Sequence, residues 1–385
     1  MLFFGSDDFS LPTLEKLHDL VDDASSGVSC VDVVVPPDRR RSKNARPTPV
    51  PVKAYAEEHG LQVYEVPADV RGPLGLSKSD WQCPKEYDLG VVVSFGYFIP
   101  AGTIDALTCG AINVHPSLLP AYRGAAPITW SVLRGDHKTG VSVIEVHPRA
   151  FDAGDMLLQV EEEVLEDTTE PELRAHLAEI GSECLLAAVR NLEVGLRPQV
   201  KQSAVHGGVV LPAPKVAKIH GHVRWGVGQP QQREGGGNDE DKEDGRTVSN
   251  TESLVCGDLD LYAPLSSRSL YNRWRALGAS VGVWADWVKN TDGKNVEVRL
   301  VKLERPVAEV PGIDTDAASP GEFYYSKSLK RIVIRCAPDA SDWSSDREKL
   351  WVPCASVQLP GKKVISCADF VNGQRLGKNW PQQFA

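Results

Sequence analysis

The first two hundred residues of this 385-residue chain alternate strand-sized apolar runs with segments whose apolar residues recur at helical spacing. Leu11, Leu14 and Leu17, for example, lie on one face of a helix. This alternation is typical of a parallel sheet covered by helices. We therefore predict an α/β fold with strands at Leu2–Phe4, Val31–Val35, Leu89–Val93, Ala111–His115 and Gly140–Val146, and helices at Ser10–Val21, Val52–His59 and Pro171–Leu192.

The second half of the chain follows a different pattern. Val296–Leu303 and Arg331–Cys336 resemble strands and Ser267–Leu277 a helix, which indicates a small β-barrel or sandwich. The segment 226–253 combines three consecutive glycines with an acidic run and cannot bury a core, so we predict a disordered insertion there. Pro, Gly and Gln residues are frequent between Leu196 and Pro214, which is typical of a domain boundary. We therefore predict a first domain at 1–200, a linker at 201–214 and a second domain at 215–385.

Composition excludes several classes of protein. No apolar run approaches the roughly 18 to 20 residues of a membrane helix, so we expect no membrane span. The eight cysteines form no C-x-x-C pair, and we predict neither a zinc site nor a disulfide framework. A net charge of −10 argues against a uniformly basic nucleic-acid binder. The charge is uneven, because residues 201–385 hold 25 Lys and Arg against 22 Asp and Glu.

The most informative window ends the predicted strand Ala111–His115. Strand alternation places Asn113 and His115 on one face, so that both side chains can converge on one substrate atom. Ligands of open parallel sheets bind at such strand ends. Asp152 follows a later apolar strand in a turn with Gly154, from which its carboxylate could orient the imidazole and favour the protonated form. Taken singly, a His–Asn pair at a strand end is more often a structural hydrogen-bond pair than a catalytic one, and an Asp before Gly is more often a turn former.

Taken together, the motifs resemble those of the folate-dependent formyltransferases. The matching runs are Phe3–Phe9 (FFGSDDF), Ser94–Pro100 (SFGYFIP), Asn113–Pro120 (NVHPSLLP), Tyr122–Ile128 (YRGAAPI) and Phe151–Gly154 (FDAG). The resemblance covers about residues 1–225 strongly and implies a Rossmann-like catalytic domain followed by a barrel of the oligonucleotide-binding type. It also implies that Asn113, His115 and Asp152 are catalytic and that the formyl donor, 10-formyltetrahydrofolate, contacts Phe95, Gly96, Ile99, Ser117, Leu118, Leu119 and Pro120.

Two features favour the branch of that family whose acceptor is methionyl initiator tRNA. Five cations, Arg39, Arg40, Arg41, Lys43 and Arg46, fall within eight residues, where that branch carries a basic insertion, and such a cluster suits phosphates. The loop departs from the family in having no glycine. The second feature is the C-terminal half, in which Pro214–Ile219 and Leu270–Ala276 resemble the opening and the helix of the family's tRNA-binding barrel. That half matches weakly, and its acidic insertion is unusual.

The implied reaction is attack of the methionyl amine on the formyl carbon, without a metal. Asn113 and protonated His115 would each stabilise the oxyanion, a contribution of about 3 to 4 kcal/mol per donor. Asp152 would orient His115 and relay a proton to the leaving folate nitrogen. The alternatives are a formyltransferase acting on a small amine, a formyl-folate hydrolase and a non-catalytic RNA-binding protein. A nicotinamide-dependent enzyme would need Gly-x-Gly-x-x-Gly after the first strand, which Gly5–Ser10 lacks.

Neither the compartment nor the oligomeric state has a direct signal in the sequence. The chain starts directly on its first predicted strand, and no presequence is visible in it. The acidic insertion and the family imply the mitochondrial matrix, with the bacterial cytoplasm as the alternative. We expect a monomer.

Overall fold

The chain divides into two compact units in the computed structural model, which describes residues 1–40, 46–79, 81–83, 85–193, 195, 200–205, 208–225, 265–289, 295–313, 318–338, 349–376 and 380–384. The first unit comprises Met1–Ile128, His137–Val164 and Pro171–Lys215. The second comprises Thr129–Asp136, Leu165–Glu170 and Val216–Ala385. Two short segments from the first half of the sequence thus belong to the second unit.

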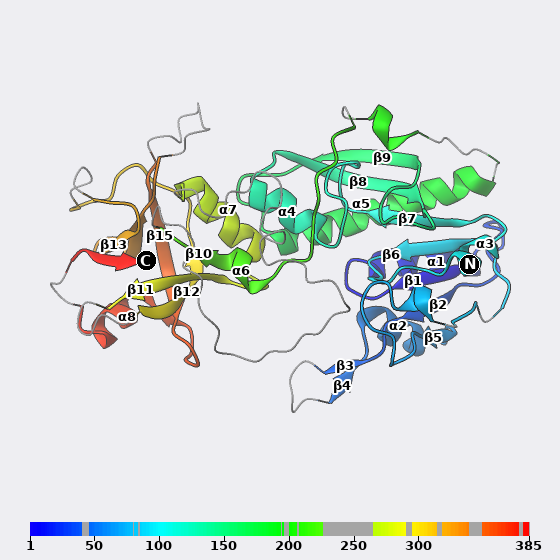
Figure 1. Cartoon of the computed structure of the whole chain (residues 1–385), viewed down its shortest axis with the longest axis horizontal. Helices are drawn as coiled ribbons and strands as arrows, with labels where there is room; N and C mark the ends of the chain where they lie inside the picture. The colour runs from blue at the N-terminus through cyan, green and yellow to red at the C-terminus, as the bar shows by residue number, and fades with distance from the viewer. Residues whose placement is uncertain are drawn as a thin grey trace. The chain divides into compact units, whose positions relative to one another are not determined.

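The first unit is built on one sheet with strand order β5-β2-β1-β6-β7-β8-β9 (Figure 1). The five strands from β5 to β7 run parallel, and β8 pairs antiparallel with both β7 and β9. The sheet is therefore mostly parallel, as predicted. Its strands are β1 (Leu2–Gly5), β2 (Asp32–Val35), β5 (Val63–Glu65), β6 (Gly90–Val93), β7 (Ala111–His115), β8 (Lys138–Glu145) and β9 (Met156–Glu163).

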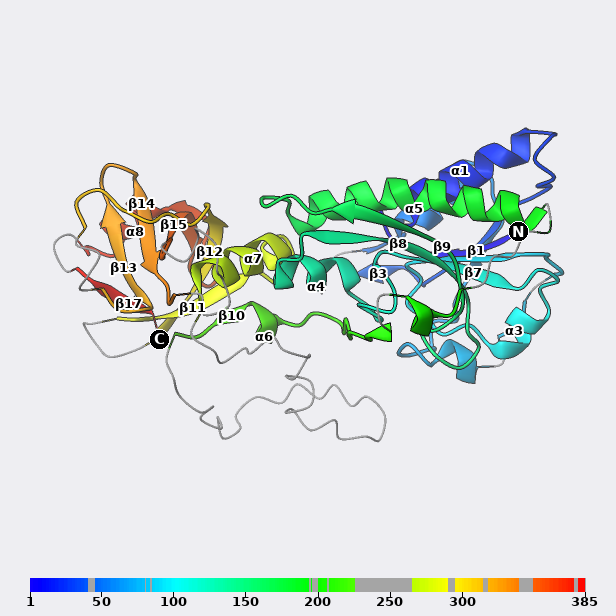
Figure 2. The ribbon, with the colours of Figure 1, turned by 90° about the horizontal axis from the view of Figure 1, so that it is seen from above.

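Helices α1, α2 and α5 pack together beside this sheet. Figure 2 shows α1 and α5 on the same side of the sheet. Lys16 of α1 forms an ion pair with Glu183 of α5 at 2.5 Å, and the ring of Tyr55 of α2 lies 5.9 Å from that of His18 of α1. Every residue of β1 and β2 is buried, because helices and neighbouring strands leave no exposed face. The helices of the first unit are α1 (Leu11–Asp22), α2 (Pro51–Glu58), α3 (Ala101–Asp105) and α5 (Glu170–Glu193), with a 3-10 turn at Leu76–Lys78. Helix α4 (Pro127–Arg134) belongs mostly to the second unit, because that unit includes Thr129–Asp136.

The predicted strands and helices of the first half are confirmed to within one or two residues, but two strands of the large sheet, β5 and β9, and the helices α3 and α4 were not predicted. β9 reads MLLQVEEE, and acidic residues interrupt its apolar pattern because it is an edge strand with one side toward solvent. β5 has only three residues, too few to show a period. A short hairpin, β3 (Arg39–Arg40) with β4 (Pro47–Thr48), forms a separate two-stranded sheet.

The second unit is a closed barrel, not a sandwich. Strands β11, β12, β15, β14, β13 and β17 pair antiparallel in that order, and β17 pairs back with β11. Its interior is an apolar cluster that includes Trp287, Phe323 and Phe370. The strands are β10 (His222–Val223), β11 (Val283–Val288), β12 (Asn295–Leu303), β13 (Glu322–Ser326), β14 (Arg331–Arg335), β15 (Trp351–Gln358), β16 (Ile365–Ser366) and β17 (Gln382–Phe384). The predicted insertion at 226–253 lies outside the described residues.

Helix α7 (Ser267–Leu277) has the predicted bounds, and Ser266 caps it by accepting a hydrogen bond from the Ser269 amide. The helix holds the segment Leu165–Glu170 within the second unit. Arg275 donates to the Thr168 carbonyl at 3.0 Å, and the Tyr271 hydroxyl donates to Asp167 at 3.0 Å. Two further helices, α6 (Lys218–Gly221) and α8 (Cys367–Gly373), complete the unit.

Among the described residues, no helix has both the length and the apolar character needed to cross a membrane. In the same residues, no group of three or more His, Cys, Asp or Glu side chains is arranged to hold a metal ion.

Candidate active site

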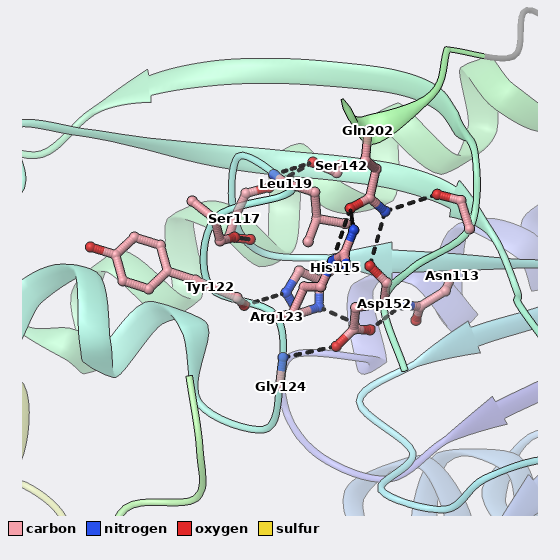
Figure 3. A network of polar contacts seen from close by, with 12 residues as sticks. Asn113, His115, Ser117, Leu119, Tyr122, Arg123, Gly124, Ser142, Asp152 and Gln202 are labelled. Carbon is pink, nitrogen blue, oxygen red and sulfur yellow. Dashed lines mark hydrogen bonds and ion pairs between the residues drawn. The ribbon is translucent and has the colours of Figure 1, made fainter. Parts of the chain in front are cut away.

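The three predicted catalytic side chains meet at the end of β7. The Asp152 carboxylate lies between the other two: its Oδ1 accepts a hydrogen bond from Asn113 Nδ2 at 3.3 Å and lies 3.4 Å from His115 Nδ1 (Figure 3). The second oxygen, Oδ2, accepts from the backbone amide of Gly124 at 2.9 Å. Asp152 thus joins two side chains of β7 to the loop that follows this strand.

The opposite edge of the His115 ring is also engaged. Its Nε2 donates to the Tyr122 carbonyl at 2.9 Å, which places a proton on that nitrogen because a carbonyl oxygen can only accept. Nδ1 is therefore the ring nitrogen that faces Asp152, at a distance longer than a good hydrogen bond. The imidazole is almost fully buried, and both of its edges are held by residues outside β7.

Backbone conformation brings Asp152 to this position. Its φ is 50°, in the left-handed region that Asp and Asn tolerate better than most residues. Two residues later, Gly154 passes so close to the backbone of β8 that a Cβ there would collide with the Glu145 carbonyl oxygen. On the facing loop Gly124 has φ 127°, and a Cβ there would lie 2.6 Å from the Ala213 carbonyl oxygen. Both glycines are required by these close approaches.

Gln202 and Arg123 belong to the same network, although the sequence did not single them out (Figure 3). Gln202 Nε2 donates to the carbonyls of Asp152 at 2.9 Å and of Gly154 at 2.8 Å. Its Oε1 accepts from Arg123 Nε at 3.1 Å and Nη2 at 2.6 Å. Gln202 lies in the predicted linker, where nothing in the local pattern signals a buried amide.

The predicted folate contacts differ in exposure. Phe95 and Ile99 are buried in the apolar cluster around Phe4, and Leu119 is buried in a smaller one with Met156. Pro120 is also buried, whereas Leu118 is half-buried and Gly96 is exposed with φ 79°.

The Ser117–Pro120 loop is held by hydrogen bonds. The Ser117 hydroxyl donates to the Ala121 carbonyl at 2.7 Å, and the Leu119 amide donates to Ser142 Oγ at 3.2 Å. Five of the seven predicted contacts, Phe95, Ile99, Ser117, Leu119 and Pro120, are therefore buried, whereas Gly96 and Leu118 are not.

The basic cluster is described only in part. Arg39 and Arg40 form β3, whose backbone pairs with Pro47 and Thr48, and Arg46 is exposed. Arg41 and Lys43 lie outside the described residues. At the foot of this hairpin, the Lys53 ammonium binds Asp38 at 2.8 Å and Glu65 at 2.5 Å.

Comparison with known proteins assigns the chain to a family. Residues 1–189 match the model of the formyl transferase domain, and residues 264–375 match that of the formyl transferase C-terminal domain. A methionyl-tRNA formyltransferase of Geobacter metallireducens is 34% identical over 376 residues, covering 98% of this chain and 96% of the relative. The chain belongs to the formyl transferase family.

Other relatives agree with this assignment. The mitochondrial methionyl-tRNA formyltransferase of Bos taurus is 28% identical over 377 residues, which are 97% of this chain and 77% of the relative. Among solved structures, a sugar 3N-formyl transferase determined in the presence of dTDP and 5-N-formyl-THF superposes with a TM-score of 0.52. It covers 94% of this chain and 98% of its own, and at 11% identity it shows the shared fold alone. This formyltransferase therefore has relatives both in bacteria and in mitochondria.

Proposed function

We propose that this formyltransferase moves the formyl group of 10-formyltetrahydrofolate onto the amino group of methionyl initiator tRNA for translation initiation, with Asn113, His115 and Asp152 as catalytic residues. The observation that carries the proposal is the Asp152 carboxylate, which is within reach of the Asn113 amide, the His115 imidazole and the Gly124 N–H at one strand end. The names of the relatives that align along nearly the whole chain support this acceptor.

Each side chain has a role that its contacts support. The amine attacks the formyl carbon, and negative charge develops on the formyl oxygen. An amide group has two N–H donors, and Asn113 uses one on Asp152, so the other can reach this oxygen. In its protonated form, His115 has a second N–H at Nδ1, 3.4 Å from Asp152, and this donor can be shared with the same oxygen.

Asp152 is the group that can accept a proton from the attacking amine and pass it to the leaving folate nitrogen. Its fixed contact with the Gly124 N–H keeps one carboxylate oxygen in place while the other exchanges partners. In the reaction, the new bond joins the amine nitrogen to the formyl carbon and the bond between that carbon and N10 of the folate breaks. The proton lost by the amine ends on the folate nitrogen.

For the folate, we propose contacts with the Ser117–Pro120 loop and with residues 94–100, in which Gly96 and Leu118 are the two predicted contact residues that are not buried. For the tRNA, the proposed contacts are the phosphates near Arg39, Arg40, Arg41, Lys43 and Arg46, together with the C-terminal barrel. We also propose that the enzyme acts as a monomer in the mitochondrial matrix, which the mitochondrial relatives support; the bacterial relatives support a bacterial cytoplasm as the alternative.

The deciding experiment mixes the purified chain with 10-formyltetrahydrofolate and methionine-charged initiator tRNA and measures formyl-methionine after deacylation. Uncharged initiator tRNA is the control for the acceptor, and an amino-sugar nucleotide is the competing acceptor. Formylation of charged tRNA alone is the expected result. Formylation of the sugar nucleotide, or hydrolysis of the folate without transfer, would refute the proposed acceptor while leaving the family assignment intact.

A further inference from the structure

Gln202 connects the two loops that define the active site. Both ends of its side-chain amide are occupied: the N–H donors serve the carbonyls of Asp152 and Gly154, and the oxygen accepts two N–H groups of Arg123. Its side chain is 5% exposed. When all donors and acceptors of a buried amide form hydrogen bonds, its replacement lowers stability because the partners lose their hydrogen bonds. Such an amide also fixes the positions of its partners.

The two carbonyls that Gln202 binds both belong to the Asp152 turn, one at Asp152 and the other two residues later at Gly154. Asp152 itself has a left-handed φ of 50°, a conformation that persists only when its surroundings hold it. By fixing the Asp152 carbonyl and the Gly154 carbonyl together, the Gln202 amide restrains the backbone beside the catalytic carboxylate.

The other end of Gln202 acts on the facing loop. Arg123 directly precedes Gly124, whose N–H binds Asp152 Oδ2. The Arg123 backbone is also paired with the chain beyond Gln202, because its amide donates to the Leu211 carbonyl at 3.0 Å and its carbonyl accepts from the Ala213 amide at 2.7 Å. The chain from Gln202 onward thus holds this loop by side chain and by backbone.

We propose that Gln202 is a positioning residue for formyl transfer: its amide sets the Asp152 carboxylate against Asn113 and His115 by holding the Asp152 turn and the Arg123–Gly124 loop in one arrangement. This inference rests on the proposed function and deepens it. Gln202 touches none of the reacting groups, so its loss acts through Asp152. The chemical step should therefore suffer more than the binding of folate.

Two substitutions separate positioning from stability. Gln202→Leu removes all four hydrogen bonds at similar size. Gln202→Glu keeps an acceptor for Arg123, as an ion pair, but sets a carboxylate against two carbonyl oxygens in place of the N–H donors. Protonation of that carboxylate restores one donor, so the ratio of variant to parent rate should rise as the pH falls. A purely structural role would not produce this dependence.

The matched control is Gln382→Leu. Gln382 is a buried amide of the barrel, 2% exposed, that accepts from Trp287 Nε1 at 3.2 Å. Its substitution also removes a buried hydrogen bond and should lower the melting temperature without lowering kcat. It therefore measures how much of any loss in the Gln202 variants comes from destabilisation alone.

The experiment measures kcat, KM for 10-formyltetrahydrofolate and melting temperature for the parent and the three variants of the full chain, between about pH 6 and pH 8. We expect kcat of Gln202→Leu to fall on the order of 100-fold, since misplacing a catalytic group by ~1 Å costs about that much. KM for the folate should change little. For Gln202→Glu we expect the loss to be greatest at high pH and to shrink on acidification.

Two results would overturn the inference while leaving the proposed function standing. One is a kcat equal to that of the parent in both Gln202 variants. The other is a loss of kcat in Gln202→Glu that stays constant over this pH range. A loss of kcat in Gln382→Leu equal to that of Gln202→Leu would also overturn it, because destabilisation would then explain both. If the parent chain forms no formyl-methionyl-tRNA, the proposed function fails and the positioning role falls with it.

Discussion

Replacing Asp152 by Asn tests the active-site geometry most directly, because it changes charge without changing size. The carboxylate accepts a hydrogen bond on each oxygen, from the Gly124 N–H on one and from Asn113 Nδ2 on the other, and the second oxygen also faces His115 Nδ1 at 3.4 Å. An amide has only one oxygen. Whichever way the substituted side chain turned, its NH₂ would face an N–H donor, and one of the two donors would lose its acceptor.

The magnitude follows from these contacts. Loss of a hydrogen bond to a charged group costs about 1.5–3 kcal/mol. Loss of a positioned proton acceptor costs on the order of 100- to 10,000-fold in rate. Since Asn113 and His115 also lose the charged group that they share, we expect kcat of Asp152→Asn to fall by at least roughly 100-fold, with binding of the folate nearly unchanged. His115→Ala should behave in the same way.

The assay is single-turnover formation of formyl-methionyl-tRNA at saturating 10-formyltetrahydrofolate, with folate affinity measured separately by calorimetry. Asp155→Asn is the matched control, because Asp155 lies in the same turn but pairs with Lys201 at 2.6 Å. We expect this control to stay within about threefold of the parent, as for other ion pairs at a protein surface. A parent-like rate in Asp152→Asn would refute the reasoning, since neither the charge nor the two-sided acceptor could then matter.

Three further predictions concern the tRNA, the second unit and the turn. Replacing Arg39, Arg40 and Arg41 by Gln should raise KM for the charged tRNA and flatten its dependence on salt, while hydrolysis of formyl-folate is spared; unchanged salt dependence would contradict the proposed contact. In α6, a helix of the unit that contains the barrel, burial lowers the pKa of His220, whose Nδ1 accepts from the Ala217 amide at 2.9 Å. Because the folded protein favours the neutral ring, the ring contributes stability at pH values above its unfolded pKa of about 6.5, and this stability is lost as the pH falls. The melting temperature should therefore drop between about pH 7.5 and 5.5, and the drop should be smaller in His220→Gln. Gly154→Ala should abolish activity because a Cβ there collides with the Glu145 carbonyl, whereas Gly102→Ala, with open space around it, should be silent in the same formylation and melting assays.

Strand β7 shows most clearly what could be predicted from the sequence. Alternation along Ala111–His115 was enough to predict that Asn113 and His115 share a face, because side-chain direction in a strand is set by the local backbone. The buried strands β1, β2 and β6 were equally readable, since strands covered on both faces leave a continuous apolar run. The motif resemblance then supplied Asp152 as the third member.

Other features were decided only by tertiary structure. Which nitrogen of His115 faces Asp152 depends on the Tyr122 carbonyl, and the strained Asp152 turn depends on Gln202, fifty residues later. The inclusion of Leu165–Glu170 in the second unit likewise depends on Arg275 and Tyr271 of α7. These contacts are made by polar groups that have no periodic signal, and most of them join residues far apart in the chain. The local sequence therefore determined the strands and the side-chain faces, and the way the chain returns on itself determined which polar groups meet there.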